Sequence, residues 1–260
     1  MTLADRVDAV HAEFRRRSAL ALGGEVSTDD GLLVWAGPNP VPAVVNGVIR
    51  TATGLRGAEV LARAGEWFGA RQRGYTVFCR SDIDRDVIDV CAERGLPHVA
   101  DGGLPEMVIH EPVTMPALAA GVSVREVETA HDRRDYRGVF AASYAQLGAP
   151  EELVDGVMPP LEMLQGDDVG AFIVDLDGTP AAVAMSVLID GVADIHWVGT
   201  MPSASRRGLG EVATAHAVAH GFAAGADVAA LQASPMGDGL YRRMGFVELY
   251  RYDEFLVLAA

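Results

Sequence analysis

The chain of 260 residues contains no lysine, so arginine supplies every fixed positive side-chain charge. Its 21 basic residues are outnumbered by 36 acidic ones, which gives a formal net charge of −15. A general nucleic-acid binder needs a basic face to neutralise phosphates, and adsorption to an anionic membrane surface also needs positive charge. We therefore expect no nucleic-acid partner and no membrane partner.

Long apolar runs and cysteines are also scarce. Charges are scattered through the first seventeen residues, unlike a signal peptide, and no window reaches the ~18 apolar residues of a membrane span. The only cysteines, Cys79 and Cys91, lie in separate apolar segments. Two isolated cysteines supply no metal-ligand cluster and are typical of buried thiols in a reducing compartment. The sequence predicts a cytoplasmic protein without a metal.

Apolar residues are abundant and make up half of the chain, while 22% of the residues are charged. This is the composition of a folded protein, and the length allows one large domain or two small ones. Helices are expected over residues 3–21, 55–73, 82–94, 131–145, 151–164, 208–224 and 239–244. Strands are expected over residues 41–49, 75–80, 107–113, 122–127, 171–176, 181–189, 193–198, 228–232 and 246–258.

The order of these elements is similar in the two halves. The second half reads strand, two helices, three strands joined by tight turns, helix, strand, helix and strand, and the first half ends in a shorter version of this order. Two prolines, Pro112 and Pro116, separate the halves. We expect an α/β (α+β) fold with two related domains at residues 1–117 and 118–260, each a mostly antiparallel mixed sheet flanked by helices.

One strand-to-helix loop carries most of the chemical information. It reads Ser205-Arg206-Arg207-Gly208-Leu209-Gly210, with Glu211 just inside the helix. N–H groups at a helix start bind anions, and glycines let a phosphate approach the backbone. A chain without lysine cannot form a Walker loop, and Ala213 stands where a dinucleotide fingerprint has its third glycine. The loop suits a diphosphate, although the glycines could also serve only to shape a tight helix start.

A second motif follows the next predicted strand and reads Leu240-Tyr241-Arg242-Arg243-Met244-Gly245-Phe246. With the loop before it, this segment resembles the GCN5-related N-acetyltransferase (GNAT) superfamily. Members carry a Gln/Arg-x-x-Gly-x-Gly/Ala loop for the pyrophosphate of coenzyme A, and a Leu-Tyr-x-x-x-Gly-Phe signature. The resemblance covers about residues 122–258. It implies that the sheet is splayed between its fourth and fifth strands.

The resemblance also implies roles for individual residues. The strand segment Val198-Gly199-Thr200 would pair with the pantetheine arm of acetyl-CoA. The pyrophosphate would be held by main-chain N–H groups of Ser205, Arg206, Arg207, Gly208, Leu209, Gly210 and Glu211. Tyr241 would be the general acid that protonates the departing thiolate, since a phenol of pKa ~10 suits that role. The alternative is that Tyr241 only packs beside Phe246.

Two positions depart from the family pattern. The loop begins with Ser205 in place of Gln or Arg, which removes one charge or amide contact. Ser234 stands where members often have Asn, and its hydroxyl could still contact the coenzyme. Neither change removes the backbone donors.

The general base is harder to assign from the sequence. Asp194 and His196 alternate on one strand and therefore share a face. Asp194 stands where some family members have a catalytic glutamate, and the ordinary pKa of histidine suits His196 to the same task. Either side chain could instead face solvent or a domain contact.

The first half lacks both motifs. Thr51-Ala52-Thr53-Gly54-Leu55-Arg56-Gly57 occupies the place of the loop without a Gly-x-Gly, and no Tyr-x-x-x-Gly-Phe follows. We expect a degenerate domain without a coenzyme site at residues 1–117, which packs against the second domain and shapes its acceptor pocket.

The sequence thus predicts an N-acyltransferase that moves an acetyl or other short acyl group from acyl-CoA to a primary amine by direct attack. Acetyl-CoA is the expected donor, and a small-molecule or peptide amine is the expected acceptor. The alternative is a non-catalytic coenzyme-A-binding module with a regulatory or protein-interaction role. A homodimer is left open as the assembly.

Overall fold

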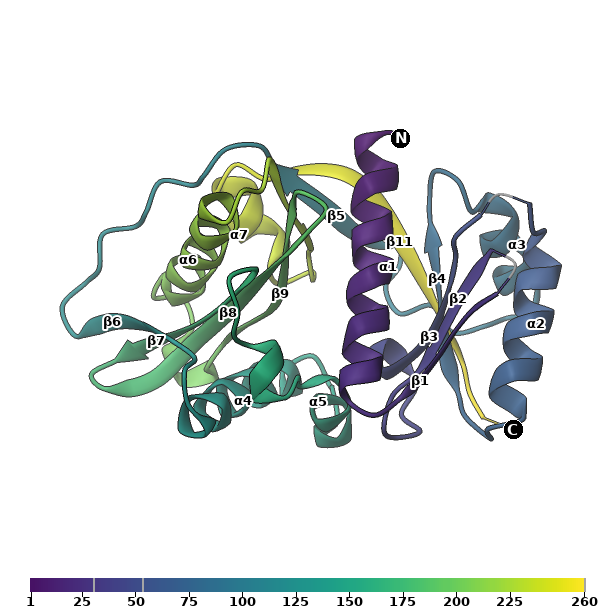
Figure 1. The fold of residues 1–260 in the computed structure, drawn as a ribbon, viewed down its shortest axis with the longest axis horizontal. Helices are drawn as coiled ribbons and strands as arrows, with labels where there is room; N and C mark the ends of the chain where they lie inside the picture. The colour runs from purple at the N-terminus through teal and green to yellow at the C-terminus, as the bar shows by residue number, and fades with distance from the viewer. Residues whose placement is uncertain (30, 53, 260) are drawn as a thin grey trace. The chain divides into compact units, whose positions relative to one another are not determined.

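The computed structural model describes residues 1–29, 31–52 and 54–259, and these divide into two compact units. The first unit comprises residues 1–106, 155–157 and 248–260, and the second comprises residues 107–154 and 158–247. The first unit thus combines the N-terminal part of the chain with its C-terminal strand, which are purple to blue and yellow in Figure 1. None of the helices in the described ranges is both long and apolar enough to cross a membrane. The domain boundary at residue 117 stays a prediction.

The first unit is built on five strands in the order β1-β2-β3-β4-β11. These are β1 (Glu25–Asp29), β2 (Leu32–Ala36), β3 (Asn46–Arg50), β4 (Tyr75–Arg80) and β11 (Val247–Val257). Neighbours are antiparallel except for β3 and β4, which are parallel. The polar strand β1 has no apolar alternation, and the sequence analysis accordingly did not predict it.

Three helices complete the first unit, namely α1 (Leu3–Ala21), α2 (Gly57–Gly69) and α3 (Arg85–Glu93). Helix α1 begins at Thr2 because the Thr2 hydroxyl accepts from the Asp5 N–H at 3.1 Å, while the Asp5 carboxylate accepts from the Thr2 N–H at 3.0 Å. This capping box satisfies two donors that a helix start leaves open. Apolar residues of α2 and α3 form a core with β2, β3 and β4 that includes Phe68, Val77 and Cys79.

The second unit repeats this plan with strands in the order β10-β9-β8-β7-β6. These are β6 (Val122–Glu126), β7 (Val169–Leu176), β8 (Thr179–Ile189), β9 (Val192–Thr200) and β10 (Val228–Gln232). The turns at Asp177-Gly178 and Asp190-Gly191 join β7, β8 and β9 into the antiparallel meander that the sequence predicted. Only β9 and β10 are parallel among these five strands. Strand β5 (Leu104–Ile109) contributes residues to both units.

Four helices belong wholly or mainly to this unit: α4 (Ala130–Ala145), α5 (Glu151–Val157), α6 (Leu209–Ala223) and α7 (Asp238–Arg243). Helices α4 and α6 cover opposite faces of the sheet (Figure 1). The small residues Ala213 and Ala217 let α6 pack closely on Phe172, Ala184 and Ile195 in a core that is almost entirely buried.

A bulge interrupts the pairing of β9 with β8, just beyond the residues at which β9 pairs with β10. Along β8 the pairing passes from Met185 opposite His196 to Val183 opposite Gly199, so β9 carries one extra residue. Trp197 lies at this point with a positive φ of 51°. The pairing of β9 with β10 ends at Asp194 and Ala230 in the described register. Because a bulge bends its strand, the fourth and fifth strands diverge here, as the sequence resemblance implied.

Candidate active site

The loop after β9 has the backbone geometry of an anion site. Gly208 is the N-cap of α6 and has a left-handed conformation with φ of 76°, and no side chain caps the helix. Arg206 also has a positive φ, 60°. The first intrahelical bond runs from the Val212 N–H to the Gly208 carbonyl at 3.1 Å. A helix start without a side-chain cap keeps N–H groups available for an anion, and the helix dipole favours negative charge there.

Gly210 allows the start of α6 to approach the end of β9. A Cβ atom at Gly210 would lie 3.0 Å from the Thr200 hydroxyl, which is tighter than ordinary contact. Gly208 has open space at the same position, so its requirement for glycine comes from φ alone. The two glycines therefore act differently, one by conformation and the other by close approach.

A cavity of about 360 Å³ opens between the end of β9, the loop, α7 and α4. The predicted residues that line it are Val198, Gly199, Thr200, Ser205, Arg206, Gly208, Leu209, Gly210, Glu211, Ser234 and Tyr241. The structure thus brings the two sequence motifs together at one cavity. Arg207 is exposed and is not among the lining residues that the structure describes. Arg206 supplies the loop charge at the cavity.

One wall of this cavity is formed by residues that the sequence did not predict. Ser143, Tyr144, Gln146 and Leu147, at the end of α4 and just after it, line the cavity, as do Met236, Gly237, Leu240 and Arg243. The Ser143 hydroxyl accepts a hydrogen bond from the Thr200 N–H at 3.2 Å, which fixes the end of β9 against α4. No local signal in the sequence marks the α4 residues, because their contact with β9 joins residues 57 positions apart in the chain.

Tyr241 is a buried phenol at the cavity. Its side chain is 7% exposed, and its ring packs against Phe246 with a centroid distance of 6.0 Å. Burial raises the pKa of Tyr241 well above its usual range, with a smaller contribution from Tyr144. The phenol is therefore protonated at neutral pH. Packing beside Phe246 and the position at the cavity are both observed, so the two alternatives for this residue are compatible.

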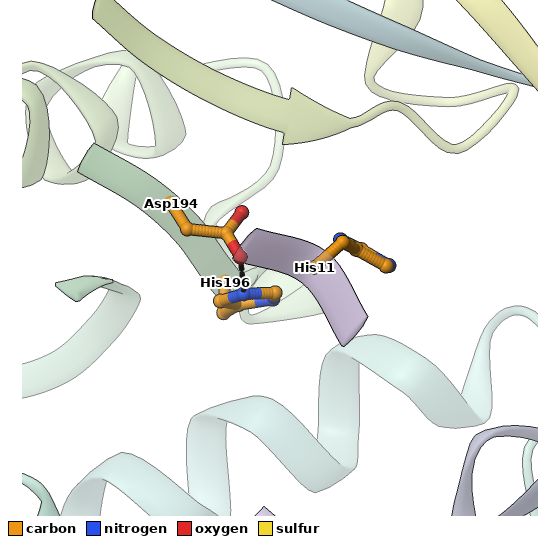
Figure 2. Close-up of side chains that lie close together, drawn as sticks. All are labelled: His11, Asp194 and His196. Atoms are coloured by element: carbon orange, nitrogen blue, oxygen red, sulfur yellow. Dashed lines mark ion pairs between the residues drawn. The ribbon is translucent and has the colours of Figure 1, made fainter. Parts of the chain in front are cut away.

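Asp194 and His196 form a buried ion pair on β9 (Figure 2). The His196 Nε2 lies 2.7 Å from an oxygen of Asp194, and their side chains are 10% and 2% exposed. Since Ala193 and Ile195 pack toward α6, alternation places Asp194 and His196 on the face covered by α4. Asp194 is also the last residue of β9 paired with β10. Neither side chain is among the residues that line this cavity in the described structure, although both lie near the point where β9 and β10 cease to pair.

The corresponding helix start in the first unit is filled by the chain itself. The Asp86 carboxylate accepts a hydrogen bond from the Gly57 N–H, the first residue of α2, at 2.7 Å. Arg50 lies within 3.0 Å of the same carboxylate and within 2.6 Å of Asp84. A carboxylate of this chain therefore takes the place of an external anion at α2.

Comparison with known proteins agrees with this geometry. Residues 136–246 match the model of the Acetyltransferase (GNAT) family. No curated protein matches the chain. This segment contains the loop, the second motif and the Asp194–His196 pair.

Several solved structures have a similar fold. A GCN5-related N-acetyltransferase from Kribbella flavida is 24% identical with a TM-score of 0.76, over 100% of this chain and 97% of that one. One from Sphaerobacter thermophilus is 15% identical with a TM-score of 0.63, over 88% and 81% of the two chains. A tandem GNAT protein from the clavulanic acid biosynthesis pathway is 15% identical with a TM-score of 0.60, over 97% and 95%. The chain has the GNAT fold, and residues 136–246 are a domain of the acetyltransferase (GNAT) family.

Proposed function

We propose that the second unit transfers an acetyl or other short acyl group from acyl-CoA to a primary amine. One observation carries this proposal: the uncapped start of α6 and the side chain of Tyr241 line the same cavity. The loop donors suit a diphosphate, and the end of β9 offers an extended strand beside which a pantetheine arm can lie. Acetyl-CoA is the donor that fits both features.

The chemistry follows from direct attack. The amine nitrogen attacks the thioester carbonyl carbon, so a C–N bond forms and the carbonyl electrons move to oxygen. When the tetrahedral intermediate collapses, the C–S bond breaks and the sulfur leaves as a thiolate. Tyr241 protonates that thiolate, and the products are an N-acyl amine and coenzyme A. Burial raises the pKa of Tyr241, so the phenol still carries its proton when the thiolate forms.

The attacking amine must lose a proton. His196 is the proposed acceptor, and Asp194 orients it and stabilises the imidazolium that forms, since the two side chains are 2.7 Å apart. Their position at the divergence of β9 and β10 supports access to the amine, through a water molecule where the distance requires one. The substrate that accepts the acyl group is proposed only as a primary amine.

We propose that the first domain has no coenzyme site, because the Asp86 carboxylate occupies the start of α2.

The experiment combines coenzyme binding with turnover. Acetyl-CoA is titrated into the full chain, and thiol release is then followed with a panel of primary amines. We expect Tyr241→Phe to bind acetyl-CoA with similar affinity and to lose about 100-fold in kcat, because a positioned general acid typically contributes that much. Binding without turnover for any amine would favour the non-catalytic module. Absence of binding would exclude both functions.

A matched pair of variants tests the loop. Arg206 lines the cavity and its neighbour Arg207 does not, so both are changed to glutamine, which keeps a polar side chain. We expect Arg206→Gln to weaken acetyl-CoA binding more at low than at high salt, because its contribution is electrostatic. Arg207→Gln should leave the affinity near that of the wild type. Equal effects of the two variants would contradict the assigned roles.

A further inference from the structure

The last residue of α7, Arg243, lines the cavity of about 360 Å³ at which the two sequence motifs meet. Its side chain is exposed and donates to the Gly239 carbonyl of the same helix at 2.7 Å. A guanidinium group has five N–H donors, and within the described ranges no carboxylate pairs with this one. The charge of Arg243 is therefore available to a ligand in the cavity.

Other arginines of the second unit are paired with carboxylates. Arg242, the neighbour of Arg243 in the sequence, lies 3.0 Å from Asp238 and is not among the residues that line the cavity in the described structure. Arg137 lies 3.1 Å from Glu151. Because the chain has 36 acidic and 21 basic residues, carboxylate partners are in excess. An arginine at a cavity that has none of them indicates an anionic ligand.

Arg243 lies on the side of α7 that faces the start of α6. A Cβ atom at Gly210, in the first turn of α6, would lie 3.8 Å from Cδ2 of Leu240. Leu240 and Arg243 are three positions apart in α7, so they share one side of that helix. Both line the cavity, as does Arg206 of the loop before α6. Two guanidinium groups from different elements thus serve the part of the cavity that suits phosphate groups.

Acyl-CoA has one more anionic group than the loop before α6 accounts for. It carries a diphosphate and, on the ribose, a separate 3′-phosphate, and a phosphate monoester has a charge of about −1.5 to −2 at neutral pH. The N–H groups at the start of α6 and the side chain of Arg206 are proposed for the diphosphate. Among the described lining residues the remaining charged groups are Glu211 and Arg243. Arg243 is therefore the cationic group that is left for the 3′-phosphate.

We propose that Arg243 binds the 3′-phosphate of acyl-CoA and thereby selects donors that carry this group. The proposal rests on the proposed function, because it takes acyl-CoA as the donor. A guanidinium group can donate two parallel N–H bonds to phosphate oxygens, which fixes orientation as well as charge. The 3′-phosphate lies at the opposite end of the coenzyme from the thioester. The contact therefore contributes to binding of the donor and not to the chemical step.

Two donors that differ only in this group test the assignment. Calorimetric titration of the full chain compares acetyl-CoA with acetyl-3′-dephospho-CoA. We expect acetyl-CoA to bind about tenfold more tightly at low ionic strength, as for one charge-assisted contact, and the preference to shrink at high salt because Arg243 is exposed. Equal affinities for the two donors at low salt would overturn the proposal. Binding of neither donor would refute the proposed function, and this proposal with it.

Variants assign the preference to Arg243. We expect Arg243→Gln to bind acetyl-CoA about tenfold more weakly and acetyl-3′-dephospho-CoA as the wild type does, so that the preference disappears. Arg243→Lys, which retains the charge, should keep part of the preference. Arg242→Gln is the matched control and should keep all of it, since Arg242 pairs with Asp238 and is not among the described lining residues.

Two results with Arg243→Gln would refute the proposal. Equal weakening of both donors would assign Arg243 to the diphosphate, and an unchanged preference would assign the 3′-phosphate to another group. In either case acetyl-CoA still binds, so the proposed function of the second unit is unaffected.

Discussion

A methyl group at Gly237 is expected to disable the proposed acid without altering its chemistry. A Cβ atom there would lie 2.7 Å from Cε2 of Tyr241 and 3.3 Å from Cζ, where ordinary contact begins at 3.4 Å. The backbone of Gly237 has φ of −86°, which alanine adopts without strain. The whole effect of Gly237→Ala therefore falls on the tyrosine ring, which must retreat by several tenths of an ångström. Since a misplacement of 1 Å can cost about 100-fold, we expect kcat to fall about tenfold.

The assay is thiol release under saturating acetyl-CoA and amine, with a neighbouring glycine as the matched control. A Cβ atom at Gly239 would meet Arg243 only at an ordinary 3.6 Å, so Gly239→Ala should keep the wild-type kcat. In a Tyr241→Phe background, Gly237→Ala should cause no further loss, because the hydroxyl that it displaces is already absent. A full additional tenfold loss in that background, or no loss in the wild-type background, would refute the reasoning.

Two further outcomes are expected. Gly208→Ala, at φ of 76° with open space around it, should lower stability by about 1 kcal/mol through backbone strain alone, seen as a fall in Tm of a few degrees. Asp86→Ala should cost about 1 kcal/mol in the free energy of unfolding, because the Gly57 N–H loses its acceptor, and unfolding in urea measures this.

The sequence predicted local elements well where apolar spacing is regular. Helix α1 and the strands β4 and β10 lie at the expected residues, and the loop before α6 has the helix-start geometry that its glycines indicated. These features depend on backbone preferences and neighbours within a few residues. The polar edge strand β1 was missed because edge strands need no alternating apolar face.

Contacts between distant segments were not predictable in this way. Strand β11 follows the second half in sequence, yet it pairs with β4 of the first unit, from Tyr252 opposite Arg80 to Val257 opposite Tyr75. The acceptor that closes the start of α2 comes from Asp86, 29 residues after Gly57. Neither segment carries a local signal for its partner, because pairing over such separations depends on how the sheets and helices pack.

The sequence by itself predicted which residues carry the chemistry of this protein: a loop with two glycines, a tyrosine after the next strand, and a carboxylate and a histidine that alternate on one strand. The tertiary structure alone decided which of them share a cavity. It placed Arg206 and Tyr241 at one cavity and left Arg207 outside it. It also made the end of α4 a wall of that cavity, although no motif marks those residues. The physical reason is that these residues come from separate segments of the chain, so only the packing of α4, β9, α6 and α7 brings them to one cavity.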